Sequence, residues 1–194
     1  MTDRPWWATA LQWSLWWIAM IAVMGWLGRA RLKPRPVHEA GSLRHPRATL
    51  IIGLVTFGFF AALTVLSNLF PNDTATWWTT AIFVGFALMG VPLIIEYVYA
   101  RHAVSAAGLS YWTYFGGAKF MAWDTLREVR FTHAMRWFRV ENSSGDVARL
   151  SVMLIGLPDF AAALLEYAPD TTVIDDETLA ILQATAAGHP PPAW

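Results

Sequence analysis

The sequence predicts a membrane protein with three transmembrane α-helices followed by a cytoplasmic α+β domain. Hydrophobic residues make up 56% of the 194-residue chain and charged residues only 14%, whereas soluble domains average about 25% charged residues. Three long uncharged runs lie before residue 100, and no comparable run follows it. The chain therefore divides near residue 100 into an apolar half and a soluble half.

The three uncharged runs are long enough to cross a bilayer. They contain 22, 23 and 19 residues, in the ranges Trp7–Gly28, Ala48–Phe70 and Trp77–Ile95. A helix that rises about 1.5 Å per residue needs about 20 residues to cross a hydrocarbon core of about 30 Å. The first run exceeds the apolar core of a secretory signal, so we expect it to be retained. The expected spans cover residues 7–28, 48–70 and 77–98.

Basic residues predict how these helices are oriented. The segment 29–47 contains six basic residues and one acid, whereas the turn 71–76 contains no basic residue. Basic residues in short loops stay on the cytoplasmic side. We therefore expect the amino terminus to be periplasmic, with segment 29–47 and the second half of the chain on the cytoplasmic side of a bacterial inner (plasma) membrane.

The same six basic residues are candidate contacts for anionic lipid headgroups, each contributing on the order of 1 kcal/mol near the leaflet. They are Arg29, Arg31, Lys33, Arg35, Arg44 and Arg47. The alternative is that they act only as the topology signal. The first 100 residues carry a net charge of +3 and residues 101–194 a net charge of −3. We therefore expect segment 29–47 to lie between the lipid and the domain, partly neutralised by acids such as Glu128, Asp159 or Glu166.

Glu96 is an acid at the end of the third span, and a carboxylate at membrane depth is costly enough to suggest a function. One interpretation is an interfacial anchor paired with Arg101 or with an arginine of segment 29–47. The other is a gating, proton-transfer or partner-binding role. Pro92 lies four residues earlier and cannot donate to the Leu88 carbonyl, so we expect a local kink there.

Three tryptophans of the first span, Trp13, Trp16 and Trp17, form a bulky aromatic face at helical spacing. One interpretation is packing against the other two spans. Their small-residue pairs, Gly58 with Ala62 and Ala81 with Gly85, are spaced to permit close backbone approach. The alternative is a groove for a lipid tail, a quinone or a partner's helix.

The second half carries strand and helix signals in a definite order. Runs of β-branched and aromatic residues predict strands over 104–115, 119–123, 126–132, 136–141 and 147–153, with turns at Gly116-Gly117 and at 142–146. Pro158 in a first turn predicts a helix from Leu157 that ends at Pro169, with Phe160, Leu164 and Tyr167 on its apolar face. A short helix over 176–186 and a proline-rich tail should follow.

Three motifs in this order resemble the bacterial pleckstrin-homology-like (PH-like) domains. They are Gly108-Leu109-Ser110, the stretch 122–131 with its Trp-Asp and Val-x-Phe elements, and the helix start 156–160. The resemblance covers residues 102–169 and implies a strongly bent antiparallel sheet capped by a carboxy-terminal helix, used to dock lipid or protein. We expect Trp123, Phe131 and Leu164 in its core. The first hairpin offers only Lys119 as a basic residue, so phosphoinositide recognition is not carried over from the resemblance.

The expected organisation is a transmembrane domain over 1–100, the PH-like domain over 101–169, and a short helix with a proline-rich tail over 170–194. The chain has no cysteine, a net charge of zero and no nucleotide-binding or nucleophile-elbow motif, so we expect no enzyme activity, no cofactor and no nucleic-acid partner. His38, Glu39 and His45 match no helical metal motif and lie among arginines, which argues against a metal site.

The expected function is that of a membrane-anchored interaction or scaffolding module. Its expected partners are a bilayer with anionic headgroups and a protein partner or a second copy of the chain. One alternative is an accessory subunit of a transporter or respiratory complex. The other is a lipid-handling membrane protein or enzyme, which would need acid or histidine pairs at membrane depth.

Overall fold

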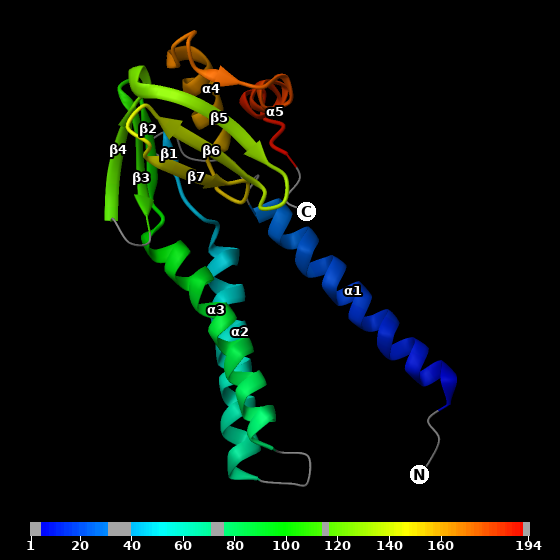
Figure 1. Ribbon diagram of the computed structural model, residues 1–194. Helices are drawn as coiled ribbons and strands as arrows, with labels where there is room; N and C mark the ends of the chain where they lie inside the picture. Colours follow the sequence, from blue (N-terminus) through cyan, green and yellow to red (C-terminus); the bar gives the residue numbers. More distant parts are fainter. Residues whose placement is uncertain (1–4, 31–39, 71–75, 114–116, 192–194) are drawn as a thin grey trace.

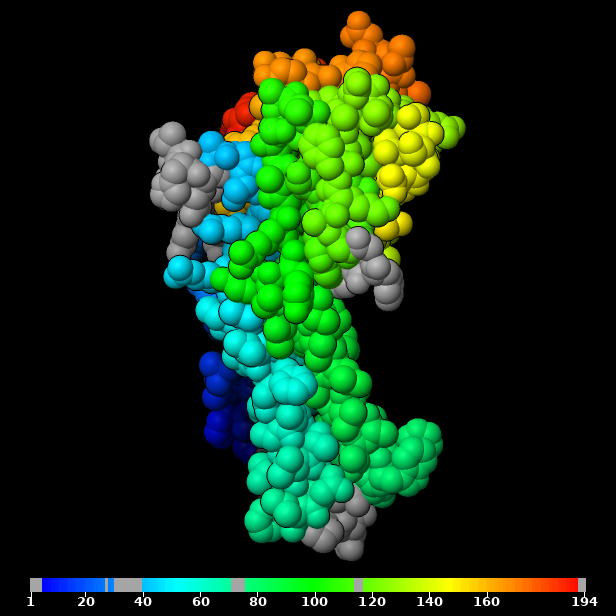
Figure 2. Space-filling model, turned by 90° about the vertical axis from the view of Figure 1, so that its left-hand side faces the viewer, coloured from blue at the N-terminus to red at the C-terminus, as the bar shows by residue number. Residues whose placement is uncertain are grey.

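The computed structural model describes residues 5–30, 40–70, 76–113 and 117–191 (Figure 1). Within these ranges, three helices are long and apolar enough to cross a membrane. They are α1 (Trp6–Ala30), α2 (Arg47–Leu69) and α3 (Trp77–Tyr99). All three extend in one direction from a β-rich domain formed by the second half of the chain (Figure 1, Figure 2). The start of α1, the end of α2 and the start of α3 therefore lie at the end of the molecule opposite the domain.

Helices α2 and α3 form a hairpin whose closest backbone approach is at Gly53 and Gly90. A Cβ atom added to Gly90 would lie 2.6 Å from the Gly53 carbonyl oxygen, so only glycine fits there. The expected contact glycines, Gly58 and Gly85, have nothing within 4 Å of such an atom. Phe60 lies between the helices near that level and stacks on Phe86 with 4.9 Å between ring centroids. The close approach of α2 and α3 therefore lies at Gly53 and Gly90, whereas aromatic rings pack between the helices near Gly58 and Gly85.

Helix α1 diverges from the α2–α3 hairpin (Figure 1). Its most apolar window has no buried residue. Trp13, Trp16 and Trp17 are 61%, 61% and 66% exposed. The structure of the single chain thus does not contain the expected packing of this aromatic face against the other two helices.

The first sheet is antiparallel with the strand order β1-β2-β3-β4. Its strands are β1 (Ser42–Leu43), β2 (His102–Ser105), β3 (Gly108–Thr113) and β4 (Gly117–Ala122). Strand β1 comes from the segment expected to be a plain basic loop, and Leu43, which pairs with His102, is only 1% exposed. The single strand expected over 104–115 is instead divided by a turn after Ser105.

The second sheet has the strand order β7-β6-β5-β8. Strands β5 (Leu126–Thr132), β6 (Trp137–Asn142) and β7 (Val147–Ser151) are antiparallel, and β8 (Val173–Ile174) is parallel to β5. A single 3-10 turn, Trp123–Thr125, connects the two sheets. In β6 every second residue is buried, which is the alternation expected of a half-exposed sheet. The antiparallel strands of the second half were thus predicted well.

Helix α4 (Leu157–Tyr167) closes the core between the sheets. It begins after Gly156, whose φ of +102° suits glycine, and it buries Leu157, Phe160, Ala161 and Leu164. Tyr167, expected on the same face, is 41% exposed. The predicted core residues Trp123, Phe131 and Leu164 are all buried, at 2%, 8% and 0% exposure.

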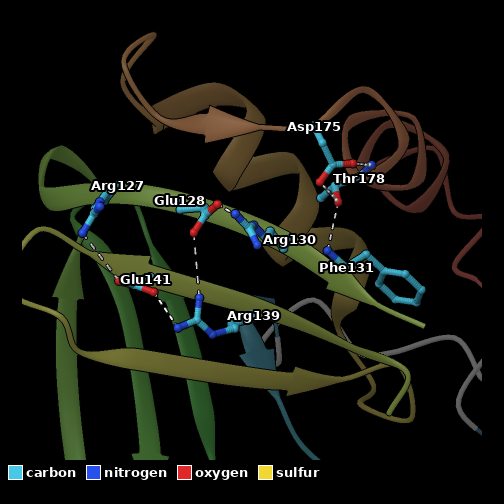
Figure 3. Close-up of polar contacts among 8 residues, drawn as sticks. All are labelled: Arg127, Glu128, Arg130, Phe131, Arg139, Glu141, Asp175 and Thr178. Atoms are coloured by element: carbon cyan, nitrogen blue, oxygen red, sulfur yellow. Dashed lines mark hydrogen bonds and ion pairs between the residues drawn. The ribbon is translucent and has the colours of Figure 1, made fainter. Parts of the chain in front are cut away.

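Helix α5 (Asp176–Ala186) packs against α4 and belongs to the same core, because Leu182 is fully buried within it. Figure 3 shows how its start is fixed to β5. The Asp175 carboxylate accepts hydrogen bonds from the backbone N–H and the hydroxyl of Thr178, both at 2.8 Å. The Thr178 hydroxyl oxygen accepts one from the Phe131 N–H at 2.9 Å. The packed domain therefore continues beyond residue 169, where the sequence placed its end.

The outer face of the second sheet pairs its own charges (Figure 3). Glu128 pairs with Arg130 and Arg139, and Glu141 pairs with Arg127 and with Arg139, the latter at 2.6 Å. Glu128 was expected to neutralise the basic segment 29–47, but its ion-pair partners Arg130 and Arg139 lie on its own sheet. Asp159 does contact that segment, because its Oδ2 accepts the Gly41 N–H at 2.8 Å.

Candidate functional site

A cavity of about 490 Å³ lies where the α2–α3 hairpin joins the β-rich domain, and we call it the neck pocket. The hairpin and its ends contribute His45, Glu96 and Ala100 to its wall. The sheets contribute His102, Trp112, Thr113, Trp137, Arg149 and Ser151, among others. Its volume falls within the range of about 300–1,000 Å³ that is common for small-molecule sites.

Strand pairing explains why residues distant in sequence meet in this pocket. Leu43 of β1 pairs with His102 of β2. His45 follows β1 and precedes α2, whereas Glu96 lies in the last turn of α3, just before β2. Because the chain leaves the first sheet through α2 and returns to it through α3, both ends of the hairpin reach the same sheet edge.

His45 is the most constrained polar side chain of the pocket. Its side chain is 6% exposed, and its Nε2 lies 3.7 Å from Glu96 Oε2. Its Nδ1 is buried, with no hydrogen-bond partner among the described residues. Burial lowers the pKa of His45 and outweighs the opposing effect of Glu96, so the imidazole is neutral near pH 7. A buried nitrogen without a partner costs free energy, and a bound group that satisfies it would recover that cost.

His102 is held in one tautomer by the backbone. Its Nδ1 accepts a hydrogen bond from the Trp112 N–H at 3.2 Å, which leaves Nε2 as the protonated nitrogen of the neutral ring. Burial, with a smaller contribution from His45, lowers the pKa of His102 to about 4. The ring is therefore a neutral hydrogen-bond donor near pH 7.

Aromatic side chains and one cation complete the wall. The Arg149 guanidinium lies 5.7 Å from the centroid of the Trp137 ring, a cation–π arrangement. Trp112 stacks on Tyr99, the last residue of α3, with 5.7 Å between centroids. The pocket thus combines one carboxylate, one guanidinium and two indole rings, a set suited to binding. Among the described residues, no group of three or more His, Asp or Glu side chains is arranged to hold a metal ion.

The residues singled out from the sequence are dispersed. Glu96 lines the neck pocket beside His45, which the sequence offered only as a metal-ligand candidate. Pro92 is exposed within α3, which continues through it. The tryptophan face lies along α1, away from the pocket.

Of the candidate lipid-contact residues, three are described and all are exposed. Arg29 lies in the last turn of α1 and Arg47 is the first residue of α2. The backbone of Arg44 bridges to Ile155 through two hydrogen bonds, of 3.2 and 2.8 Å. Arg31, Lys33 and Arg35 lie outside the described residues, as do His38, Glu39 and the turn residues 71–75.

The sequence interpretation missed His102, Trp112, Trp137 and Arg149 as pocket residues. One signal was available. His45 comes just before one apolar run and His102 just after another, so both should lie at the same membrane boundary. The contributions of Trp137 and Arg149 depend on how the two sheets pack, which no local pattern reports.

Comparison with known proteins agrees with the geometry. Residues 100–171 match a family model described as a bacterial PH domain. The match begins at Ala100 in the pocket wall and covers β2 to β7 and α4. No curated protein and no solved structure matches the chain. The second half of this chain therefore contains a bacterial PH-like domain, formed by antiparallel strands and a closing helix.

Proposed function

We propose that the chain is a three-span protein of a bacterial inner membrane that holds its PH-like domain at the cytoplasmic surface as an interaction or scaffolding module. The observation that carries the proposal is the continuity between the hairpin and the first sheet. Arg47, the first residue of α2, lies four residues after Leu43 of β1, and only Ala100 and Arg101 separate α3 from β2. With so little chain between them, the domain cannot move away from the membrane surface.

Exposed apolar surface supports the membrane placement. The spanning candidates expose large side chains over most of their length, which would be unfavourable in water. Trp6, Trp7, Trp77 and Trp78, all more than half exposed, lie at the ends of α1 and α3 that are remote from the domain. Tryptophan is typical of membrane interfaces, so this end is suited to the periplasmic boundary.

The basic segment 29–47 supports the orientation. Arg29, Arg44 and Arg47 are exposed near the domain end of the helices, where they would face the headgroups of the cytoplasmic leaflet. Each such residue contributes on the order of 1 kcal/mol of attraction to anionic lipid. The acidic PH-like half of the chain would be repelled by the same surface. We propose that these arginines are the contacts with anionic lipid and that the domain surface is left for a protein partner.

Reporter fusions test the orientation. A reporter that is active only in the periplasm should be active when fused after Asp73 and silent when fused after Trp194. A second reporter, active only in the cytoplasm, should give the opposite pattern and serves as the expression control. If the two patterns were exchanged, the proposed orientation would be rejected.

The exposed aromatic face of α1 favours a second candidate, an accessory subunit of a transporter or respiratory complex. Trp13, Trp16 and Trp17 are each more than 60% exposed in the single chain. A partner's helix would cover this face. Co-purification in a mild detergent tests this, because replacing Trp13 and Trp17 with leucine should release the partner and leave the span apolar. A free-standing scaffold would show no such loss.

A further inference from the structure

We propose that the neck pocket binds the phosphoethanolamine group of an aminophospholipid, with the ammonium group at Glu96 and His45 and the phosphate at Arg149 and His102. That the ligand is a membrane lipid rests on the membrane placement proposed above. The presence of the pocket does not depend on that placement.

The charges of the pocket select a zwitterion. Glu96 and Arg149 carry opposite charges and both line the cavity, whereas the two histidines are neutral. A simple anion would face the Glu96 carboxylate, and a simple cation would face the Arg149 guanidinium. A ligand with an ammonium and a phosphate separated by two carbons satisfies both side chains together.

The hydrogen-bonding groups of the pocket also separate into an end that accepts from an ammonium and an end that donates to a phosphate. His45 Nε2 lies 3.7 Å from Glu96 Oε2. A primary ammonium placed beside this pair donates N–H groups to the carboxylate and, with the His45 proton on Nδ1, to Nε2. At the other end, the backbone bond from Trp112 leaves His102 with a protonated Nε2, which is a donor suited to a phosphate oxygen.

The aromatic wall and the position of the pocket fit the same ligand. The Trp112 and Trp137 rings line the cavity and exclude water around the ligand. Glu96 and Ala100 place the cavity at the end of α3, the level at which headgroups meet a spanning helix. Acyl chains would then extend beside the exposed apolar surfaces of α2 and α3.

The test measures lipid retained by the full-length chain in detergent. The protein is exposed to mixed micelles containing phosphatidylethanolamine, phosphatidylcholine or phosphatidylglycerol, and bound lipid is counted by native mass spectrometry. We expect phosphatidylethanolamine to be retained in preference to both others. Arg149→Gln should weaken its retention about tenfold, the effect of losing one charge-assisted hydrogen bond. Glu96→Gln should abolish the preference over phosphatidylglycerol, because the ammonium loses its partner.

Arg127→Gln is the matched control, because the Arg127 side chain is 69% exposed and does not line the pocket. It should retain lipid as the unmodified chain does. Equal retention of the three lipids, or equal retention by the Arg149→Gln, Glu96→Gln and Arg127→Gln variants, would overturn the proposal.

Soluble glycerophosphoethanolamine distinguishes the two sources of the group. If it displaces the bound lipid only at much higher concentration, the membrane lipid is the ligand. If glycerophosphoethanolamine raises the unfolding temperature of lipid-depleted protein and phosphatidylethanolamine does not, the pocket binds the phosphoethanolamine group of a soluble compound. The lipid assignment is then rejected. Binding in micelles does not depend on orientation, so these results and the reporter fusions can fail separately.

Discussion

Two buried histidines, His45 and His102, lie between the helix hairpin and the first sheet, and each is neutral for a different structural reason. His45 is enclosed beside Glu96, and His102 accepts a backbone hydrogen bond from Trp112. Protonation of His102 at Nδ1 would break that bond and place a charge in a site that is 7% exposed. We therefore expect the junction between the α2–α3 hairpin and the domain to be sensitive to acid.

We expect acid to destabilise the domain through His102. Its folded pKa is about 4, below the ordinary value of 6.5. Its contribution is therefore complete above pH 6.5 and is lost as the pH falls from 6.5 toward 4. The loss amounts to about 3 kcal/mol of unfolding free energy. His102→Gln, whose amide oxygen can accept the Trp112 N–H but does not titrate, should show a smaller loss. Urea unfolding in detergent at pH 6.5 and at pH 4 measures the loss of unfolding free energy. Equal losses in the unmodified chain and in His102→Gln would contradict the prediction.

At the scale of elements, the contact between α2 and α3 depends on two glycines that leave no room for a side chain. A Cβ atom on Gly53 would lie 3.0 Å from the Gly90 carbonyl oxygen and 2.9 Å from a side-chain carbon of Ile94. The backbones are therefore in direct contact at this level, in the halves of α2 and α3 nearer the domain. Close backbone contact of this kind stabilises helix pairs in lipid, where no hydrophobic effect drives association.

Gly90→Leu should separate the two helices, and Gly85→Leu should not. The leucine at position 90 would meet the Gly53 carbonyl oxygen and the Phe57 backbone, whereas position 85 has open space around it. We expect the first variant to lose about 1–3 kcal/mol of stability, the usual cost of overpacking. Thermal unfolding in detergent compares the two variants. Equal unfolding temperatures would show that the glycine contact is not important for the hairpin.

The elements that the sequence predicted well are those with a local pattern. Strands β5 to β7 have alternating apolar residues, α4 has a proline in its first turn, and α5 has acidic residues in its first turn. All five elements lie within a few residues of their expected positions. Strands β1 and β8 have two residues each, too few for any period, and they exist only because of tertiary pairing. Among site residues, Glu96 was recognisable as an acid next to a span, but its neighbours come from other parts of the chain.

In the whole molecule, the α2–α3 hairpin is an insertion within a β-hairpin of the domain. Strands β1 and β2 are antiparallel neighbours, and α2 and α3 lie between them in sequence. The hairpin and the domain are not independent of each other. Leu43 precedes α2 and α3 in the sequence, yet its side chain belongs to the domain core. A domain defined from residue 101 onward lacks this strand and leaves the edge of β2 uncovered.

The insertion predicts how a soluble domain can be made. Residues 40–46 joined by a short glycine-serine linker to residues 101–191 should fold as a soluble protein, because β1 and β2 then form a simple hairpin. Residues 101–191 alone should be less stable by about 2–5 kcal/mol, the range for losing one large buried aliphatic side chain such as Leu43. Leu43→Ala in the joined protein should account for much of that difference. Urea unfolding followed by tryptophan fluorescence measures all three. Equal stability of the joined protein and of residues 101–191 would mean that β1 does not contribute to the domain.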